Sequence, residues 1–308
     1  MFTRLPHTLT SLALILCAVV LCSLAAVAQD PNDLKPGSVL FFNRYTSSAS
    51  NPAAEDTQIN ITNTNQSLSI DVHLFLVDGS SCSVADSYVS LTGSQTTYFL
   101  ASDFDPGVKG YIVAVATAGG LPVQHDFLLG VAYIRESDGR FTDLPAVTLK
   151  KKLAGTVTDP GDGSAVITFD GGAGANSYDK LPGTVAISAF NSQTTDSTIF
   201  AVYSPANDLR TGENPTVSIF GLMYNQLEAS RSLTFRANCY TTFTLKSLRV
   251  LSGIDNFIPR GSNGWLKMSS TSRPLLGMTH SKGPVFNGGR NLSVLTLYPT
   301  FSITVPAF

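Results

Sequence analysis

The chain has 308 residues, a formal net charge of −2 and only 14% charged side chains. This length is sufficient for about two domains of ordinary size. A nearly neutral chain lacks the clustered positive charge that nucleic-acid binding requires, so the composition argues against a nucleic-acid partner. Few charges combined with abundant Ser, Thr, Asn and Gly are typical of exported all-β proteins, whose sheets are covered by hydroxyl and amide groups.

Residues 1–28 predict a secretory signal peptide. Arg4 precedes an apolar run over residues 12–27, and the run ends in an Ala-Val-Ala sequence that a signal peptidase can cleave. The run is close to the length of a membrane span, so an uncleaved anchor is the alternative. No later segment predicts a transmembrane helix. We therefore expect a secreted or bacterial envelope protein, periplasmic or extracellular, whose mature chain starts with a short leader over residues 29–37.

Signal-peptide cleavage leaves two cysteines, Cys82 and Cys239. In an oxidising compartment two thiols can form one disulfide. The two cysteines fall at non-equivalent places in the two halves of the chain, so a link between domains and two separate thiols are both open. Their wide spacing excludes a local metal motif, and the sequence also lacks H-x-H and H-E-x-x-H patterns. We predict neither a metal site nor a cofactor.

Residues 38–149 predict an antiparallel β-sandwich. Short runs alternate with a period of two and are rich in β-branched and aromatic residues. Gly, Pro, Asn, Asp and Ser clusters bound them at intervals of about 8–15 residues, as turns between strands do. The runs read SVLFFNRY, DTQINITNT, SIDVHLFLVD, DSYVSLTG, TTYFL, GYIVAVAT and DFLLGVAYI.

Residues 150–183 predict a linker rich in Gly, Asp and Pro, and residues 184–308 predict a second sandwich. The run SAVITF inside the linker resembles a strand, so we expect it to attach to one of the sheets. Runs of the second half include TVAISAFN, STIFAVYSP, PTVSIFGLMY, SLTFRAN, GWLKMSS, LLGMTHS and LSVLTLYP. The basic sequence KKK at 150–152 is interpreted as a solvated part of the linker.

The two halves show four matches in the same order. DTQINITNTN matches STIFAVYSPAN, SIDVHLFLVDGSS matches TVSIFGLMYNQLE, TTYFL matches TTFTL, and Gly110-Tyr111 matches Gly264-Trp265. A repeated strand order with different loop lengths is expected of a duplicated unit. We therefore predict an all-β fold of two tandem antiparallel, immunoglobulin-like β-sandwich domains that arose by internal duplication. The shared Gly-aromatic pattern is interpreted as a β-hairpin rather than a catalytic signature.

No catalytic residue is predicted. His125 and His280 follow their turns at nearly equal distances, which favours a structural role for both, although His125 and Asp126 could supply a base and an orienting acid. The sequence contains no G-x-S-x-G nucleophile elbow. The acidic stretches 102–107 and 158–164 do not complete a calcium-loop pattern and are interpreted as ordinary turns.

Tyr111 and Trp265 are the candidate ligand-facing aromatics. Trp265 is the only tryptophan of the chain, and Tyr111 is its counterpart in the first half. An exposed ring on a sandwich face can stack on sugars, whereas a ring that opens a strand beside a Gly turn more often packs inward. Both interpretations remain open for each ring, with inward packing favoured.

The sequences GYIVAVAT, GLPVQHDFLLGVAYIRESDGRFTDLPAVTL and INITNTNQSLSIDVHLFLVDGSSC in the first half, with GWLKMSS and PLLGMTH in the second, give the chain a family resemblance. It resembles a group of uncharacterised exported β-sandwich proteins of environmental bacteria that has no established activity. The likeness covers most of residues 38–149 and, more loosely, 184–308. It implies a β-sandwich and an envelope or extracellular location, and it brings no site residues.

These observations favour an exported, non-catalytic surface, matrix or binding protein whose partner is a polysaccharide or another envelope protein. The alternative is an exported polysaccharide hydrolase whose carboxylates are assembled by the fold. A third hypothesis is an outer-membrane β-barrel, because the chain ends in Phe308 as such barrels do, although many runs are shorter than barrel strands.

Overall fold

The computed structural model describes residues 32–191, 198–247, 253–259, 262–283 and 287–307, so the predicted signal peptide lies outside the described residues. The all-β prediction is confirmed: antiparallel sheets make up the molecule, with two short helices, α2 (Ala101–Phe104) and α3 (Ile254–Phe257). Neither of these described helices is long and apolar enough to span a membrane.

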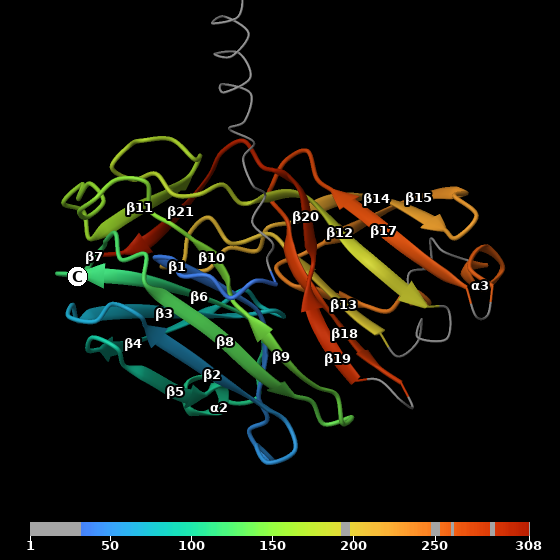
Figure 1. The fold of residues 1–308 in the computed structure, drawn as a ribbon, viewed down its shortest axis with the longest axis horizontal. Coiled ribbons are helices and arrows are strands. Elements are labelled where there is room, and N and C mark those ends of the chain that lie inside the picture. The colour runs from blue at the N-terminus through green and yellow to red at the C-terminus, as the bar shows by residue number, and fades with distance from the viewer. Residues whose placement is uncertain (1–31, 192–197, 248–252, 260–261, 284–286, 308) are drawn as a thin grey trace, which may run out of the picture.

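The first half, β1 to β10, consists of two sheets in a sandwich-like arrangement (Figure 1). The larger has the order β10-β1-β6-β3-β4 with β7 on β6, and the smaller has the order β5-β2-β8-β9. The sheets pack closely, because a Cβ added at Gly130 of β8 would lie 2.6 Å from the ring of Phe42 on β1. The strands are β1 (Val39–Thr46), β2 (Asp56–Asn63), β3 (Ile70–Asp78), β4 (Val84–Leu91), β5 (Thr96–Leu100), β6 (Lys109–Ala118), β7 (Leu121–Pro122), β8 (Leu128–Arg135), β9 (Phe141–Pro145) and β10 (Val147–Leu149).

The second half, β12 to β20, also has two sheets. The larger has the order β15-β14-β17-β12-β20, and the smaller has the order β16-β13-β18-β19. Their apolar faces enclose a second core, in which Phe190 of β12 and Phe200 of β13 meet edge to face at 6.3 Å. The strands are β12 (Pro182–Asn191), β13 (Thr198–Tyr203), β14 (Val217–Asn225), β15 (Ser230–Ala237), β16 (Thr241–Phe243), β17 (Asn263–Ser269), β18 (Leu276–Lys282), β19 (Asn287–Asn291) and β20 (Ser293–Leu297).

Both halves place their strands in the same order. The strand order of each sheet in the first half matches that of a sheet in the second half. The equivalent strands are β1 and β12, β3 and β14, β6 and β17, and β8 and β18. The central strands also share an irregularity: the pairing of β1 with β6 shifts between Phe42 and Tyr45, and that of β12 with β17 shifts between Ile187 and Phe190. Such β-bulges re-aim the residues that they leave unpaired.

The Gly-aromatic pattern has a backbone cause in both halves. A Cβ added at Gly110 would lie 1.8 Å from the carbonyl oxygen of Val77, and one added at Gly264 would lie 2.8 Å from that of Tyr224. Each glycine therefore lets β6 or β17 approach the neighbouring strand, β3 or β14, at the end of their pairing. This close approach explains the repeated pattern without any chemistry.

The strand-like run in the predicted linker is β11 (Ser164–Phe169), which pairs with β21 (Phe301–Pro306) over its whole length. Both strands pack with the first half, since Phe169 of β11 meets Phe41 of β1 edge to face at 6.0 Å. Figure 1 shows β21, in red, on the blue and green half of the molecule. The last strand of the region predicted as the second domain therefore completes the core of the first half.

The interpretation of the basic sequence at 150–152 as solvated is wrong for Lys151. This residue is buried, and its ammonium group donates to the carbonyl oxygen of Leu153 at 2.7 Å. Its neighbours Lys150 and Lys152 contact Asp179 instead. The basic run is thus tied to the folded part of the linker.

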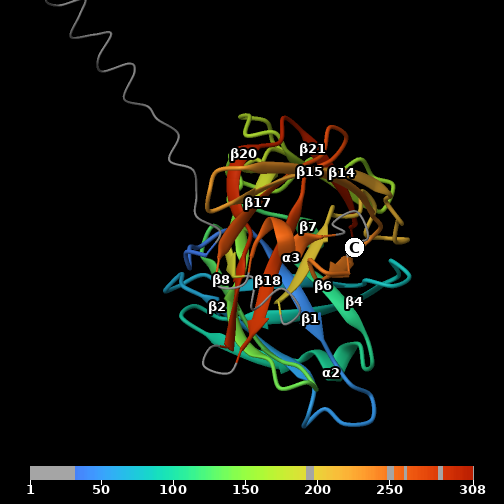
Figure 2. The ribbon, with the colours of Figure 1, turned by 90° about the vertical axis from the view of Figure 1, so that its right-hand side faces the viewer.

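The two halves pack against each other, with β18 beside β1 (Figure 2), and they share an apolar interface. The outer face of β13 and β18 contributes Tyr203, Leu276 and Met278 to the larger core, which extends from the first half. Opposite these strands lie β1, which contacts β18, and β9, which contacts β19. A continuous core of this kind fixes the orientation of the halves.

Candidate functional site

A stacked aromatic pair, one ring exposed and the other partly buried, lies on the outer face of the five-stranded sheet of the second half. Trp265 of β17 is the cross-strand partner of Tyr224 on β14, and their rings stack at 4.5 Å with an angle of 9° between planes. Trp265 remains 36% exposed, and Phe220 on the same face of β14 is 48% exposed. We call Phe220, Tyr224 and Trp265 the aromatic ridge. The ridge presents aromatic ring surface to solvent on this face.

Tyr111, the counterpart of Trp265, has the opposite environment. It is 0% exposed and stacks on Tyr203 of the second half at 4.1 Å. Its hydroxyl oxygen accepts a hydrogen bond from the backbone N–H of Ala206 at 3.1 Å. The ligand-facing interpretation is therefore wrong for Tyr111, because the segment after β13 covers its ring.

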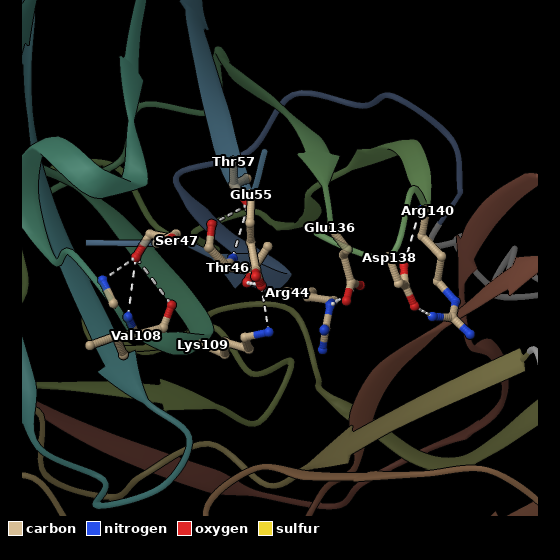
Figure 3. Close-up of polar contacts among 12 residues, drawn as sticks. Arg44, Thr46, Ser47, Glu55, Thr57, Val108, Lys109, Glu136, Asp138 and Arg140 are labelled. Atoms are coloured by element: carbon tan, nitrogen blue, oxygen red, sulfur yellow. Dashed lines mark hydrogen bonds and ion pairs between the residues drawn. The ribbon is translucent and has the colours of Figure 1, made fainter. Parts of the chain in front are cut away.

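A buried polar network lies where the halves meet. The bulge of β1 leaves Asn43 and Arg44 without cross-strand partners on β6. Arg44 is buried, and its Nε donates to Glu136 Oε1 at 3.0 Å. In Figure 3 Arg44 lies between Glu136 on one side and the Glu55–Lys109 ion pair on the other. The bulge thus places a cation at the interface of the two halves.

Glu136 is held by both halves of the molecule. Besides Arg44, it contacts His280 of β18, whose Nδ1 lies 3.2 Å from Glu136 Oε1. Burial alone would raise the pKa of Glu136, but the His280 hydrogen bond and the Arg44 charge outweigh it and lower that pKa to about 2. The other ring nitrogen of His280, Nε2, is buried and has no hydrogen-bond partner among the described residues.

Asn43 joins three further segments to this network. Its Oδ1 accepts a hydrogen bond from the Tyr203 hydroxyl at 2.8 Å. Its Nδ2 donates to the carbonyl oxygen of Gly277 at 3.0 Å and to Asn291 Oδ1 at 2.8 Å. The amide is therefore satisfied on both sides, as a buried polar group must be.

A cleft of about 470 Å³ opens beside this network, between the halves. Arg44 lies in its wall, and Lys109 at the start of β6 adds a second cation. Tyr240 packs closely over the turn after β3, since a Cβ added at Gly79 would lie 2.9 Å from Tyr240 Cβ. The described lining contains no carboxylate and consists of Arg44, Gly79, Ser80, Lys109, Asn214, Asn238, Tyr240, Thr241 and Thr242.

Cys82 and Cys239 form a disulfide beside the cleft, with their Cα atoms 5.7 Å apart. Cys82 lies in the turn between β3 and β4, and Cys239 follows β15, so the bond joins the two halves. Of the two arrangements left open by the sequence, the structure has the link between halves. The bond also holds together two walls of the cleft.

His125 and His280 are not at equivalent positions, so the equivalence inferred from their spacing is wrong. His280 lies within β18, whereas His125 precedes β8. His125 Nε2 is 2.8 Å from Asn63 Oδ1, and Asp126 accepts hydrogen bonds from Ser38 and from the backbone N–H of Lys151. The adjacent histidine and acid thus bind different partners and do not form a base and its orienting acid.

The polar network and the cleft were not predicted from the sequence. One signal for them was present, because Asn43 and Arg44 interrupt the apolar run VLFF of a strand that is otherwise expected to be buried. A buried arginine needs a partner, but that partner, Glu136, lies 92 residues away and has no local motif.

No protein-family model matches the chain, and no curated protein matches it. Among solved structures, the chain is weakly similar to an oxalate decarboxylase from Lactobacillus farciminis, with 8% identity, 87% of this chain and 76% of that chain covered, and a TM-score of 0.16. A deletion variant of the Bacillus subtilis oxalate decarboxylase gives 9% identity, 88% and 68% coverage, and a TM-score of 0.17. Likenesses of this size carry no argument about fold or function.

Proposed function

We propose that the protein is an exported, non-catalytic binding protein of the bacterial envelope or exterior that holds a polysaccharide on the outer face of the five-stranded sheet of its second half. The observation that carries the proposal is the exposed ring of Trp265, which stacks on the partly buried ring of Tyr224. The same position of the first half is buried under other segments, so exposure is not imposed by the shared strand order.

The ridge has the chemistry that a sugar chain requires. A pyranose ring has an apolar face of C–H groups, which packs on an aromatic face, while its hydroxyls need polar neighbours. Around the ridge the face carries Ser230, Ser232, Lys267 and Ser269 on the strands flanking or containing it. These groups can satisfy the hydroxyls of a sugar stacked on Trp265.

The proposal includes two tandem immunoglobulin-like domains that arose by internal duplication. The common strand order, the β-bulge in both central strands and the glycine before Tyr111 and Trp265 support it. Export is supported by the composition of residues 1–28 and by the disulfide, since disulfides persist in oxidising compartments. The resemblance to exported β-sandwich proteins agrees with this location.

Binding is favoured over hydrolysis by the state of the acids near the cleft. Glu136 is bonded to Arg44 and His280, and Glu55 is paired with Lys109. A glycoside hydrolase needs two carboxylates that face the sugar, one of them able to give up a proton. Carboxylates fixed by cations behind the cleft wall do not match that arrangement.

The single tryptophan allows a direct test. Cellohexaose and chitohexaose are titrated into the purified protein while the intrinsic fluorescence is recorded. Because all indole emission comes from Trp265, stacking of a sugar should shift the emission maximum and saturate. Retention on insoluble cellulose and chitin is measured in parallel, with Trp265→Ala expected to lose most of it.

Tyr98→Ala is the matched control, because Tyr98 is a 70% exposed aromatic on the smaller sheet of the first half. This variant should be retained as well as the unmodified chain. Unchanged fluorescence with every oligosaccharide, or equal retention of Trp265→Ala, would refute the binding face. Release of reducing ends from the polymers would establish the hydrolase instead.

A further inference from the structure

We infer that the cleft between the two halves is a second binding site, independent of the aromatic ridge, and that it takes a single uronic-acid unit. Its carboxylate would face Arg44 and Lys109, and its hydroxyls would face the neutral polar groups of the lining. The volume of about 470 Å³ is in the range of small-molecule sites.

The charge of the lining determines the sign of the ligand. Arg44 and Lys109 are the only ionisable groups of the described lining apart from the Tyr240 phenol. Their counterions, Glu136 and Glu55, are not part of the described lining. The carboxylates thus pair with the cations from outside the described lining, and the lining offers hydrogen-bond donors to a ligand.

Arg44 keeps donors available for a ligand. A guanidinium has five N–H groups in a planar fork. Nε is used by Glu136, and Nη1 makes only a long contact of 3.4 Å with the Tyr240 hydroxyl. Because Arg44 is almost fully desolvated, a carboxylate that reaches its remaining donors would form a strong charge-assisted bond.

The remaining lining distinguishes a sugar acid from a simple carboxylate. Hydroxyl and amide groups from both halves surround the two cations, namely Ser80, Asn214, Asn238, Thr241 and Thr242. Such groups donate and accept, as the hydroxyls of a sugar do. The cleft is also pre-formed, because the disulfide joins the turn after β3 to the segment after β15. A rigid site loses less entropy on binding.

The test compares three probes on the purified protein by calorimetry and NMR titration: D-glucuronate, D-glucose and acetate. Glucuronate should bind with a Kd of about 1 mM or tighter. Glucose and acetate should bind at least about tenfold more weakly, because glucose lacks the carboxylate and acetate lacks the hydroxyls. Added salt should weaken glucuronate binding, because the attraction is partly ionic.

Lys109→Gln should weaken glucuronate binding about tenfold, the loss expected for one charge-assisted bond. Lys109 is half exposed, so this variant should fold. Lys150→Gln removes an exposed cation outside the cleft and should bind like the unmodified chain. Arg44→Lys keeps the charge but loses the fork, and should weaken binding if it folds.

Equal affinity for glucose, equal affinity for acetate, or no effect of Lys109→Gln would each overturn the inference. An acidic peptide that binds as tightly as glucuronate would also overturn it, by assigning the cleft to protein carboxylates. Failure of the proposed function would be seen in Trp265 fluorescence and polymer retention. It can therefore be distinguished from failure of the uronic-acid site, which would be seen in the glucuronate titrations.

Discussion

The larger sheets of the two halves have five strands in the same order, but their outer faces carry different surfaces. In the first half Val113 and Val115 of β6 lie on this face and are buried. The corresponding residues of β17 are Lys267 and Ser269, as their pairing with β14 shows. Neither side chain of this second pair is buried. The same backbone arrangement therefore carries apolar residues where other segments cover the sheet and polar residues where the sheet is open.

The covering segments account for the difference. The strands β11 and β21 and the segment after β13 pack on the first sheet, through contacts such as Phe41–Phe169 and Tyr111–Tyr203. The second sheet lacks such a cover among the described residues, yet it keeps Phe220 at a largely exposed position. Large apolar residues retained on an open face are typical of binding surfaces.

Exchanging the residues at one equivalent position should affect the stability of the two halves very differently. Val113→Lys would bury an ammonium group without a partner, so we expect a loss of more than about 4 kcal/mol of unfolding free energy or no folding. Lys267→Val on the open face should change stability by less than about 0.5 kcal/mol. Urea unfolding of both variants measures the difference, and similar losses would show that both faces are covered.

A second pair of variants tests the aromatic positions. Tyr111→Ala should cost about 3–5 kcal/mol, because it removes a fully buried ring stacked on Tyr203. Trp265→Ala should cost about 1 kcal/mol or less, since its ring is partly exposed and loses mainly the Tyr224 contact. Thermal and urea unfolding measure both. If Trp265→Ala were the more damaging change, its ring would be part of a core and not of a binding face.

Lowering the pH should weaken the contact between the halves without altering the outer face of either sheet. The pKa of Glu136 is lowered from 4.5 to about 2 in the folded protein. Its contribution is therefore present above pH 4.5 and is lost as the pH falls toward 2, and it amounts to about 3 kcal/mol. Urea unfolding between pH 7 and pH 2 measures it.

Glu136→Gln is the control for that series, because other acids also titrate in this range. The difference in stability between the unmodified chain and the variant should shrink as the pH falls. Two parallel curves would mean that Glu136 does not contribute through its charge. Trp265 fluorescence of the folded protein should remain constant until unfolding begins.

The strands could be predicted from the sequence because alternation reflects which face of a strand meets a core. The runs around Tyr111 and Trp265 illustrate this. The β-hairpin expected after each of their glycines is present in the first half, where β6 pairs with the short β7. It is wrong for the second half, where the next strand, β18, lies in the other sheet and does not pair with β17. The environments of the two rings could not be predicted from the local pattern. Burial of Tyr111 depends on Tyr203 and Ala206, which lie far along the chain and carry no signal of where they pack.

The candidate site was less predictable than the fold. The cleft needs Arg44 from a bulge, Lys109 from a strand end and Tyr240 from the other half. These residues converge only after the halves have docked, so no spacing in the sequence relates them. The ridge was closer to prediction, because Trp265 stands out as the single tryptophan on an alternating strand.

The pairing of β11 with β21 has a consequence for the order of events during synthesis. Thr168 of β11 and Ser302 of β21 are cross-strand partners separated by 134 residues. Until the last strand has been made, β11 has an unpaired edge, which is a template for association with other chains. Contacts so distant in sequence also slow folding. Maturation of the amino-terminal half therefore depends on residues 301–306, and a nascent chain remains prone to association until β21 has been made.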